Sequence, residues 1–292
     1  MNSTINQILV TGANGQLGRE VCTVLGEMPH LQVWPTDVAE LDITCAQAID
    51  RFITEHDIDC IINCAAYTAV DAAESDADRC HLLNAEAPRL LAEASQAHDA
   101  HLIHISTDYV FDGKGCRPYR EDDTVCPQSV YGATKALGEQ AIIKTAPNHS
   151  IIIRTAWLYS PHGKNFVKTM LRLGAERDAL RVVVDQVGTP TYALDLARAI
   201  AAIIQSEHWQ PGIYHFTDEG AISWYDFTKA IHRLASINGC HVEPCLTADY
   251  PTPAQRPHFS VLDKTKIKST FHITIPYWED SLRHCIGRLM NQ

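Results

Sequence analysis

The stretch LVTGANGQLGRE, residues 9–20, decides the fold that this sequence predicts. It begins in an apolar run that reads as a β-strand and passes into a segment with the apolar period of an α-helix. Gly12, Gly15 and Gly18 stand at intervals of three between the strand and the helix. Such glycines permit a tight turn and bring the backbone close to a pyrophosphate at the helix N-terminus. The spacing is a variant of the commoner fingerprint, and in this context it predicts a dinucleotide site.

Short apolar runs alternate with helical patterns along the first two-thirds of the chain. Strands are predicted at residues 7–12, 31–37, 59–66, 101–111 and 150–159, and helices at 15–27, 45–56, 76–98 and 129–140. Strands that alternate with helices form a parallel sheet covered on both faces, and right-handed crossovers make it doubly wound. We therefore predict an α/β fold of the Rossmann type.

The pattern becomes looser in the last third of the chain. Helices are predicted at 164–176 and 191–209, isolated strands at 181–191 and 212–218, and an extended proline-rich loop at 250–263. We expect residues 1–160 to form the dinucleotide-binding domain, with later strands and helices returning to it. We expect residues 161–292 to form mainly a smaller C-terminal substrate-binding lobe.

Composition and charge exclude several classes of protein. The chain has 292 residues, of which 46% are hydrophobic and 20% charged, as in ordinary globular proteins. The net charge of −11 and the absence of a Lys/Arg run argue against nucleic acid as a partner. No apolar run is long enough to span a membrane, and the N-terminus lacks the pattern of a signal peptide. We expect a cytoplasmic protein with no membrane partner.

The ten cysteines and fifteen histidines do not predict a metal site. The cysteines form no C-x-x-C pair, and the histidines show no H-x-x-x-H or H-E-x-x-H spacing. Several cysteines, such as Cys60 and Cys64, stand in apolar runs, where buried free thiols are the better interpretation. We predict no metal ligands.

The end of the second predicted strand bears on the choice of cofactor. Asp37 stands nineteen residues after Gly18, where a carboxylate would accept hydrogen bonds from the adenine-ribose 2′-hydroxyl of NADH. Arg19, beside the glycine turn, could instead meet the 2′-phosphate of NADPH. Asp37 can also be read as a helix cap or turn residue. The expected cofactor is NADPH or NADH, with the preference open.

Two further stretches carry acid–base chemistry. In ISTDYVFDG, Ser106, Thr107 and Asp108 end the fourth predicted strand, at the edge where ligands bind in open α/β sheets. In SVYGATKALGEQ, Tyr131 and Lys135 lie one helical turn apart. A free tyrosine has a pKa near ~10, and a neighbouring ammonium lowers it. The hydroxyl could then protonate a substrate oxygen as hydride reaches the adjacent carbon.

Taken together, these stretches resemble the extended short-chain dehydrogenase/reductases and, within them, the dTDP-4-dehydrorhamnose reductase family. The matching stretches are TGANGQLG, NCAAYTAVDAAE, STDYVFDG, VYGATKALGE, RTAWLY, NFVKTMLRL, VVDQVGTPTYALDLA, GIYHFTD and YPTPAQRPHFSVLD, in the family order. The resemblance implies an NAD(P)H-dependent oxidoreductase of polysaccharide precursor synthesis. Its expected reaction is reduction of the C4 keto group of dTDP-4-dehydro-L-rhamnose, a nucleotide sugar, to dTDP-L-rhamnose.

The resemblance also implies roles for individual residues. Thr107, Tyr131 and Lys135 would form the catalytic set. Tyr131 would be the general acid, Lys135 would lower its pKa and bind ribose, and Thr107 would hold the C4 oxygen. The residues expected to line the cofactor are Gly12, Gly15, Gln16, Leu17, Gly18, Asp37, Asp42, Ile43, Ala66, Tyr67 and Thr68.

The substrate residues implied by the resemblance are Thr107, Asp108, Trp157 and Arg256. Asp108 and Trp157 would contact the sugar, and Arg256 would reach toward the nucleotide-sugar. Trp157 can equally be a core aromatic, and Arg256 can be a cap of its own loop. These residues do not separate dTDP-4-dehydrorhamnose from the 4-keto sugars that lead to dihydrostreptose or 6-deoxytalose.

Two alternative functions and two open properties accompany this interpretation. A non-catalytic NADP-binding subunit, like the partner of methionine adenosyltransferase, has no need of a tuned tyrosine. Dehydratases usually carry an Asp-Glu pair after the catalytic threonine, whereas Asp108 is followed here by Tyr109.

Some relatives hold magnesium at a dimer interface, but Leu194 stands where an acid is expected, so the sequence does not support magnesium. The protein could be a monomer or a homodimer.

Overall fold

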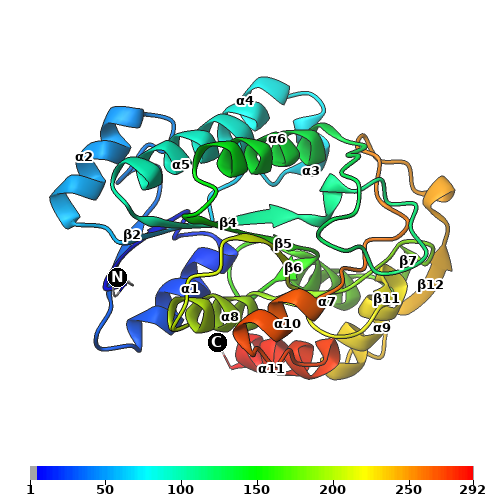
Figure 1. The fold of residues 1–292 in the computed structure, drawn as a ribbon. Coiled ribbons are helices and arrows are strands. Elements are labelled where there is room, and N and C mark those ends of the chain that lie inside the picture. Colours follow the sequence, from blue (N-terminus) through cyan, green and yellow to red (C-terminus); the bar gives the residue numbers. More distant parts are fainter. Residues whose placement is uncertain (1–4, 292) are drawn as a thin grey trace.

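The computed structural model describes residues 5–291, and its centre is a sheet of six parallel strands (Figure 1). The strands are β1 (Gln7–Thr11), β2 (Gln32–Thr36), β3 (Cys60–Asn63), β4 (His101–Thr107), β5 (Ser150–Thr155) and β10 (Gly212–His215). Their order across the sheet is β10-β5-β4-β3-β1-β2. The chain winds from β1 to β2 in one direction and then crosses to β3 in the other. The switch point, where such folds bind ligands, therefore lies between β1 and β3. The predicted α/β, doubly wound fold is confirmed.

Helices cover both faces of this sheet (Figure 1). One face carries α1 (Gln16–Gly26), α8 (Ala193–Ile204) and α10 (Thr265–Phe271), and the other α2 (Ala46–His56), α5 (Ala87–Ala97) and α6 (Val130–Thr145). Successive side chains of a strand point to opposite faces, so each strand contributes to two cores. Along β4, Ile103 packs with the α1 and α8 layer and Leu102 with the α5 and α6 layer. His104 shares the parity of Leu102 and so lies on the α6 face.

Elements from the second half of the chain form a lobe at the end toward which the strands of the sheet point (Figure 1). They are α7 (Phe166–Glu176), β7 (Ala179–Val183), β8 (Val187–Gly188), β11 (Ile222–Ser223), α9 (Trp224–Leu234), β12 (His241–Cys245), η3 (Thr247–Asp249) and α11 (Trp278–Met290). A core around Phe227, Ile231 and Leu282 joins these helices and strands. The elements α9, β12 and α11 were not predicted from the sequence.

Several predicted elements differ from the structure. The strand expected to be isolated at 212–218 is instead β10, an edge strand of the main sheet that pairs in parallel with β5. The helix predicted at 76–98 is confirmed as one unbroken helix over 77–97, but its middle is a π-helical turn: α4 (Ala77–His81), η1 (Leu82–Glu86) and α5 follow one another without a gap. Pro88, which lacks a backbone N–H, lies just after this π-helical turn, where the regular α-helical hydrogen-bond pattern is interrupted.

Two predicted strands are also shorter than expected. The strand predicted at 101–111 ends at Thr107, because a 3₁₀ turn, η2 (Asp108–Val110), follows it. The strand predicted at 150–159 is divided into β5 and β6 (Leu158–Tyr159). Trp157 has a φ of +49° between them, and a left-handed residue cannot continue a strand. β6 then pairs with β9 (Thr191–Tyr192).

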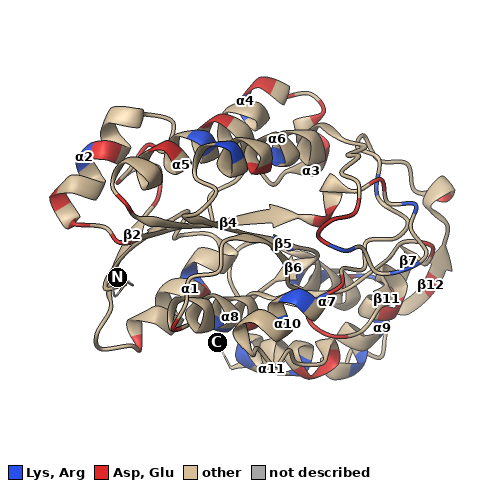
Figure 2. Ribbon diagram, in the orientation of Figure 1, with Lys and Arg blue, Asp and Glu red and all other residues tan. Residues whose placement is uncertain are grey.

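Charge is distributed over both helical layers, and acidic and basic residues are interspersed in the view of Figure 2. Within residues 5–291 there is no helix with the length and apolar character needed to cross a membrane. All ten cysteines are free thiols, and five of them are buried.

Candidate active site

The glycine turn has the close packing that its sequence predicts. Gly12 has a φ of +64°, and a Cβ there would lie 2.7 Å from the backbone nitrogen of Ala65, at the end of β3. A Cβ on Gly18 would lie 2.3 Å from the carbonyl oxygen of Gly12. Neither position has room for a side chain, so α1 begins close against the ends of β1 and β3. Gly15 caps α1 without a side-chain hydrogen bond, which leaves the first-turn N–H groups available to a ligand.

A cleft of about 880 Å³ runs along the ends of β1, β3, β4 and β5 from this turn to α6. Most of the predicted site residues line it: Gly12, Gly15, Gln16, Leu17, Asp37, Asp42, Ile43, Ala66, Thr68, Thr107, Asp108, Tyr131, Lys135 and Trp157. Three predicted residues, Gly18, Tyr67 and Arg256, are not among its lining residues. Residues far apart in the sequence therefore meet around one volume, with the glycine turn at one end and the Tyr-Lys helix at the other.

Gly18 and Tyr67 support the cleft from outside it. Gly18 is buried where α1 packs on the turn. The backbone N–H of Tyr67 donates to Asn84 Oδ1 at 2.8 Å, and Asn84 Nδ2 donates back to the Tyr67 carbonyl at 3.0 Å. The Tyr67 hydroxyl donates to Asp76 at 3.2 Å. Asn84, on the π-helical turn, thus holds the loop whose neighbours Ala66 and Thr68 line the cleft.

Arg256 lies beside the cleft and is tied to the main domain. Its Nη2 pairs with Asp71 Oδ2 at 2.5 Å, and its Nη1 donates to the Tyr109 hydroxyl at 3.0 Å. Asp71 belongs to α3 (Val70–Ala73), and Tyr109 lines the cleft. The guanidinium therefore reaches the site through Tyr109, and the proline-rich loop is joined to α3 by this ion pair.

Asp37 and Arg19 both bond to Asn14 in the glycine turn. The Asn14 backbone N–H donates to Asp37 Oδ2 at 3.2 Å, and the Asn14 carbonyl accepts from Arg19 Nε at 3.1 Å. Arg19 is exposed and Asp37 is partly exposed. A carboxylate suited to a 2′-hydroxyl and a guanidinium suited to a 2′-phosphate thus stand together at the same end of the cleft.

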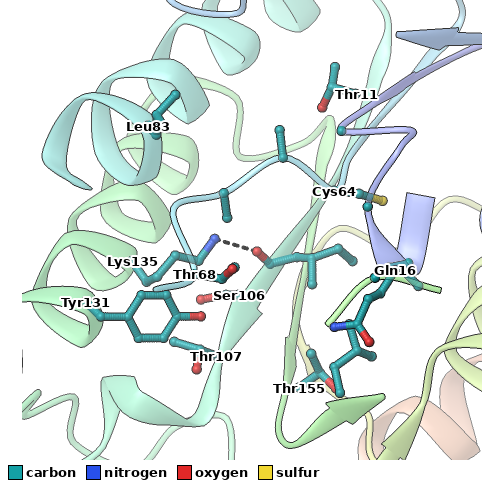
Figure 3. A pocket seen from close by; sticks show the side chains of 18 of the residues that line it. Thr11, Gln16, Cys64, Thr68, Leu83, Ser106, Thr107, Tyr131, Lys135 and Thr155 are labelled. Carbon is teal, nitrogen blue, oxygen red and sulfur yellow. Dashed lines mark hydrogen bonds between the residues drawn. The ribbon is translucent and has the colours of Figure 1, made fainter. Parts of the chain in front are cut away.

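The three residues of the expected catalytic set converge at the other end (Figure 3). Figure 3 shows the Tyr131 ring beside Lys135, with its hydroxyl directed toward Ser106 and Thr107. Lys135 is 1% exposed, and its Nζ donates to the Ile105 carbonyl at 2.6 Å. The Thr107 hydroxyl donates to Asp108 Oδ1 at 3.0 Å. The reactive groups of α6 are thereby directed onto the end of β4.

Local sequence explains why α6 approaches β4 so closely. Ser129 caps the helix, and its hydroxyl accepts from the Gly132 backbone N–H at 3.1 Å. A Cβ on Gly132 would lie 2.2 Å from the Tyr109 carbonyl oxygen. Glycine at this position lets the first turn of α6 rest directly on η2. Tyr131 consequently lies next to the strand end that carries Thr107.

Burial controls the ionisation of the site. It raises the pKa of Tyr131 well above the usual tyrosine value, and a hydrogen bond with Thr107 offsets this only in part. We expected Lys135 to lower this pKa, but the net shift without a cofactor is upward, because burial is the largest contribution and the charges of Asp108, Tyr109 and Cys80 act in the same direction. Burial also lowers the pKa of Lys135 to about 8 and raises the pKa of Asp108 to about 6. At neutral pH Tyr131 keeps its proton, which is the form that a proton donor requires.

Three residues that contact the predicted site residues, directly or through a neighbour, were not themselves predicted from the sequence. Trp224 stacks on Trp157 with ring centroids 3.4 Å apart, and it lies in α9, which was not predicted. His104 and Asn63 lie behind Lys135 in the sheet. The alternation of Leu102, His104 and Ser106 along one strand face was an available signal for His104. No local pattern pointed to Trp224.

The cleft fits a dinucleotide better than a metal ion. The glycines form a cradle that any side chain would fill, and the buried hydroxyl of Ser106 has no hydrogen-bond partner among residues 5–291. A ligand in the cleft could supply that partner. In the part of the chain that the structure describes, no group of three or more His, Cys, Asp or Glu side chains is arranged to hold a metal ion.

Comparison with known proteins agrees with this geometry. A family model described as the RmlD substrate binding domain matches residues 6–291. A dTDP-4-dehydrorhamnose reductase of Aggregatibacter actinomycetemcomitans is 43% identical, with 95% of this chain and 97% of that protein covered. A crystal structure of a dTDP-4-dehydrorhamnose reductase from Clostridium acetobutylicum has a TM-score of 0.93 and 45% identity, covering 97% of this chain and 99% of that one.

A second solved structure contains a cofactor. The dTDP-4-dehydrorhamnose reductase of Bacillus anthracis, solved in complex with NADP, has a TM-score of 0.93 and 38% identity and covers 97% of this chain and 99% of its own. These similarities extend over nearly the whole chain and include the glycine turn, the strand ends and α6. The resemblance drawn from the sequence motifs is confirmed, and the chain belongs to the dTDP-4-dehydrorhamnose reductase family, whose model is that of the RmlD substrate binding domain.

Proposed function

We propose that this protein reduces the C4 keto group of dTDP-4-dehydro-L-rhamnose with NADPH or NADH, forming dTDP-L-rhamnose. The observation that carries the proposal is the convergence of Thr107, Tyr131 and Lys135 at one end of a cleft whose other end is the glycine turn. A dinucleotide that spans this distance would present its nicotinamide beside Tyr131. The relatives named dTDP-4-dehydrorhamnose reductase support the choice of substrate.

Each residue of the cleft has its own role in the proposed reaction. When bound, the dinucleotide would supply hydride for the keto carbon. The Thr107 hydroxyl orients the keto oxygen, and Tyr131 gives this oxygen its proton from a phenol that burial keeps protonated at neutral pH. Asp108, ionised above its pKa of about 6, accepts from a sugar hydroxyl. Trp157 supplies an aromatic face for the hexose, and Lys135 stabilises the phenolate once its amine is charged.

The glycine turn and the small residues after β3 hold the dinucleotide in this proposal. NADP bound to the reductase of Bacillus anthracis supports NADPH as a cofactor. Asp37 beside Asn14 supports use of NADH as well. We also propose that the lobe around Phe227 binds the nucleotide-sugar, and that the protein acts in the cytoplasm, as ten free cysteines suggest.

A direct assay tests the function. The purified chain is supplied with dTDP-4-dehydro-L-rhamnose and either NADPH or NADH, cofactor oxidation is followed by absorbance, and the product sugar is identified by NMR. Formation of dTDP-L-rhamnose is expected. If cofactor is oxidised but the product is a different 6-deoxyhexose, the assignment of dTDP-L-rhamnose as product is wrong. No turnover with either cofactor would overturn the proposal.

Binding measurements separate the alternative functions. The protein as purified is expected to carry no nicotinamide absorbance, because a reductase exchanges its cofactor in every turnover. Purification with tightly bound NAD would favour an epimerase or dehydratase. NADPH binding without reductase activity, together with stoichiometric capture of an enzyme, would favour a regulatory subunit.

A further inference from the structure

A buried histidine lies directly behind Lys135. His104 is fully buried on the α6 face of β4. Its Nδ1 is 2.9 Å from Asn63 Nδ2, and its Nε2 is 3.2 Å from Lys135 Nζ. The imidazole ring has no part in the proposed reduction. Its hydrogen bonds nevertheless determine which form of Lys135 fits the site.

The orientation of the Asn63 amide is determined by its other two partners. Asn63 Oδ1 accepts from the Ala65 backbone N–H at 3.1 Å and from the Thr11 hydroxyl at 2.7 Å. A backbone N–H can only donate, so the amide atom that faces it has to be the oxygen. The Nδ2 group is therefore the one that faces His104, and it donates to His104 Nδ1.

The acceptor role of Nδ1 determines the tautomer of His104. Burial lowers the pKa of His104 well below its usual value, so the ring is neutral. A neutral imidazole carries one proton, and with Nδ1 accepting, that proton is on Nε2. The Nε2–H group then faces Lys135 Nζ. An ammonium has three donors and no acceptor, whereas an unprotonated amine has a lone pair that can accept.

We propose that His104 is a positioning residue for Lys135: its Nε2–H donates to the Nζ lone pair and shifts the equilibrium of Lys135 toward the unprotonated amine, until bound cofactor or a phenolate on Tyr131 favours the ammonium. The Ile105 carbonyl accepts one amine hydrogen and fixes the direction of the remaining one. The role of this contact in catalysis rests on the proposed function. The ionisation of Lys135 itself does not depend on the proposed function.

The other groups around Lys135 oppose this effect. Glu139 on α6, Cys80 on α4 and Cys64 after β3 each act to raise the pKa of Lys135, and burial outweighs them. Glu139 is itself neutralised by Arg154 on β5, whose Nη2 is 2.6 Å from Glu139 Oε2. On α6, the neutral Tyr131 phenol brings no charge. The Nε2–H of His104 is thus the contact that specifically disfavours an ammonium at this position.

Nuclear magnetic resonance of the protein without added cofactor tests the proposal. Lysine labelled with carbon-13 at Cε reports ionisation of the amine, and the Lys135 signal is assigned by its loss in Lys135→Arg. It is expected to titrate near pH 8, against about 10.4 for a free lysine. Nitrogen-15 shifts of His104 are expected to show the Nε2–H tautomer at pH 9, where Lys135 is mainly the unprotonated amine. A Lys135 that titrates as an ordinary lysine, or an Nδ1–H tautomer, would overturn the proposal.

Substitutions then separate His104 from general burial. His104→Gln places an amide oxygen within reach of Nζ and is expected to raise the Lys135 titration by about one pH unit. Asn63→Asp reverses the order of donors and acceptors from residue 63 to Lys135. The new carboxylate accepts from His104 Nδ1–H, and His104 Nε2 is then free to accept from the Lys135 ammonium. His215→Gln is the matched control, since His215 is equally buried on β10 and bonds to the Tyr119 carbonyl. An unchanged titration in His104→Gln, or an equal shift in His215→Gln, would show that burial alone sets the ionisation of Lys135.

Proton uptake links this device to cofactor binding. Calorimetric titration of NADPH at pH 8.5 in buffers of different ionisation enthalpy counts the protons taken up on binding. Wild-type protein is expected to take up a fraction of a proton, and His104→Gln distinctly less. No uptake by wild-type protein would exclude the coupling. Failure of the reductase assay would leave these titrations unaffected, so the two proposals fail independently.

Discussion

Arg154 of β5 and Glu139 of α6 form a bidentate ion pair between the sheet and the helix that carries Tyr131 and Lys135. Arg154 Nε donates to Glu139 Oε1 at 2.9 Å and Nη2 to Oε2 at 2.6 Å, and their side chains are 1% and 3% exposed. The pair fixes the rotation of α6 relative to the sheet. It therefore fixes the direction in which Tyr131 and Lys135 project into the cleft.

Removing one member of this pair is expected to unfold the site. Glu139→Gln leaves a buried guanidinium without its counter-charge and should lower the free energy of unfolding by about 3–5 kcal/mol, measured by urea denaturation. Arg172→Ala removes the exposed pair with Glu176 and should change stability by no more than about 0.5 kcal/mol. If the two substitutions lower the free energy of unfolding equally, the buried pair contributes no more to stability than an exposed pair does.

Tyr131→Phe is expected to lower kcat by about 10²–10⁴-fold, because it removes the proton donor and leaves the ring in place. The Kd for NADPH, measured by fluorescence titration, should stay within a factor of about two, since the hydroxyl is directed at Thr107 and not at the glycine turn. A variant with ordinary kcat would contradict the assignment of Tyr131.

Gly18→Ala is expected to weaken NADPH binding at least tenfold, on the order of 1.4 kcal/mol. The new Cβ would lie 2.3 Å from the Gly12 carbonyl oxygen and would push α1 away from the turn. Gly26→Ala, at the other end of α1, meets no atom within 4 Å and is the matched control. The control should bind NADPH as wild type does and be slightly more stable. Equal affinities for the two variants would contradict the role of the turn.

Trp224→Leu is expected to raise KM for the nucleotide-sugar about tenfold while the Kd for NADPH is unchanged. Trp224 stacks on Trp157, whose backbone is held at a φ of +49°, so loss of the stack frees Trp157 to leave the cleft wall. Trp209 is a control, because it stacks on His101 away from the cleft. A comparable rise in KM for Trp209→Leu would point to general destabilisation.

Asp108→Asn is expected to stabilise the protein and impair the enzyme. The pKa of Asp108 is raised to about 6 in the folded protein, above about 3.9 when unfolded, so the folded state binds the proton more tightly. Stability from this group is therefore present below pH 4 and is lost as the pH rises through 6. At pH 7.5 the Asn variant should gain up to about 3 kcal/mol, seen as a higher Tm. Its kcat/KM should be lower than that of the wild type and should no longer decrease as the pH falls through about 6. A lower Tm for the Asn variant would contradict the burial argument.

Much of the fold was predictable because it depends on short-range patterns. The glycine turn, the alternation of strands and helices, and the Tyr131–Lys135 spacing each involve residues within a few positions of one another. Their conformations follow from backbone sterics and helix geometry. The lobe was predicted incompletely. Its helix α7 was expected, and α9 and α11 were missed although their apolar residues recur at helical spacing. The two-residue strands β8 and β11 are too short to carry a pattern of their own and are stabilised by tertiary pairing.

The sequence by itself determined the glycine turn, the doubly wound sheet and the placing of Tyr131 and Lys135 one helical turn apart, since each depends on local residue order. Only the tertiary structure decided that β10 completes the sheet, that Arg256 pairs with Asp71 185 residues away, and that His104 meets Lys135. It also decided the ionisation of the site. A pKa depends on burial and on the hydrogen bonds of neighbours from other elements, and Tyr131 shows that these can reverse the direction that spacing alone suggests.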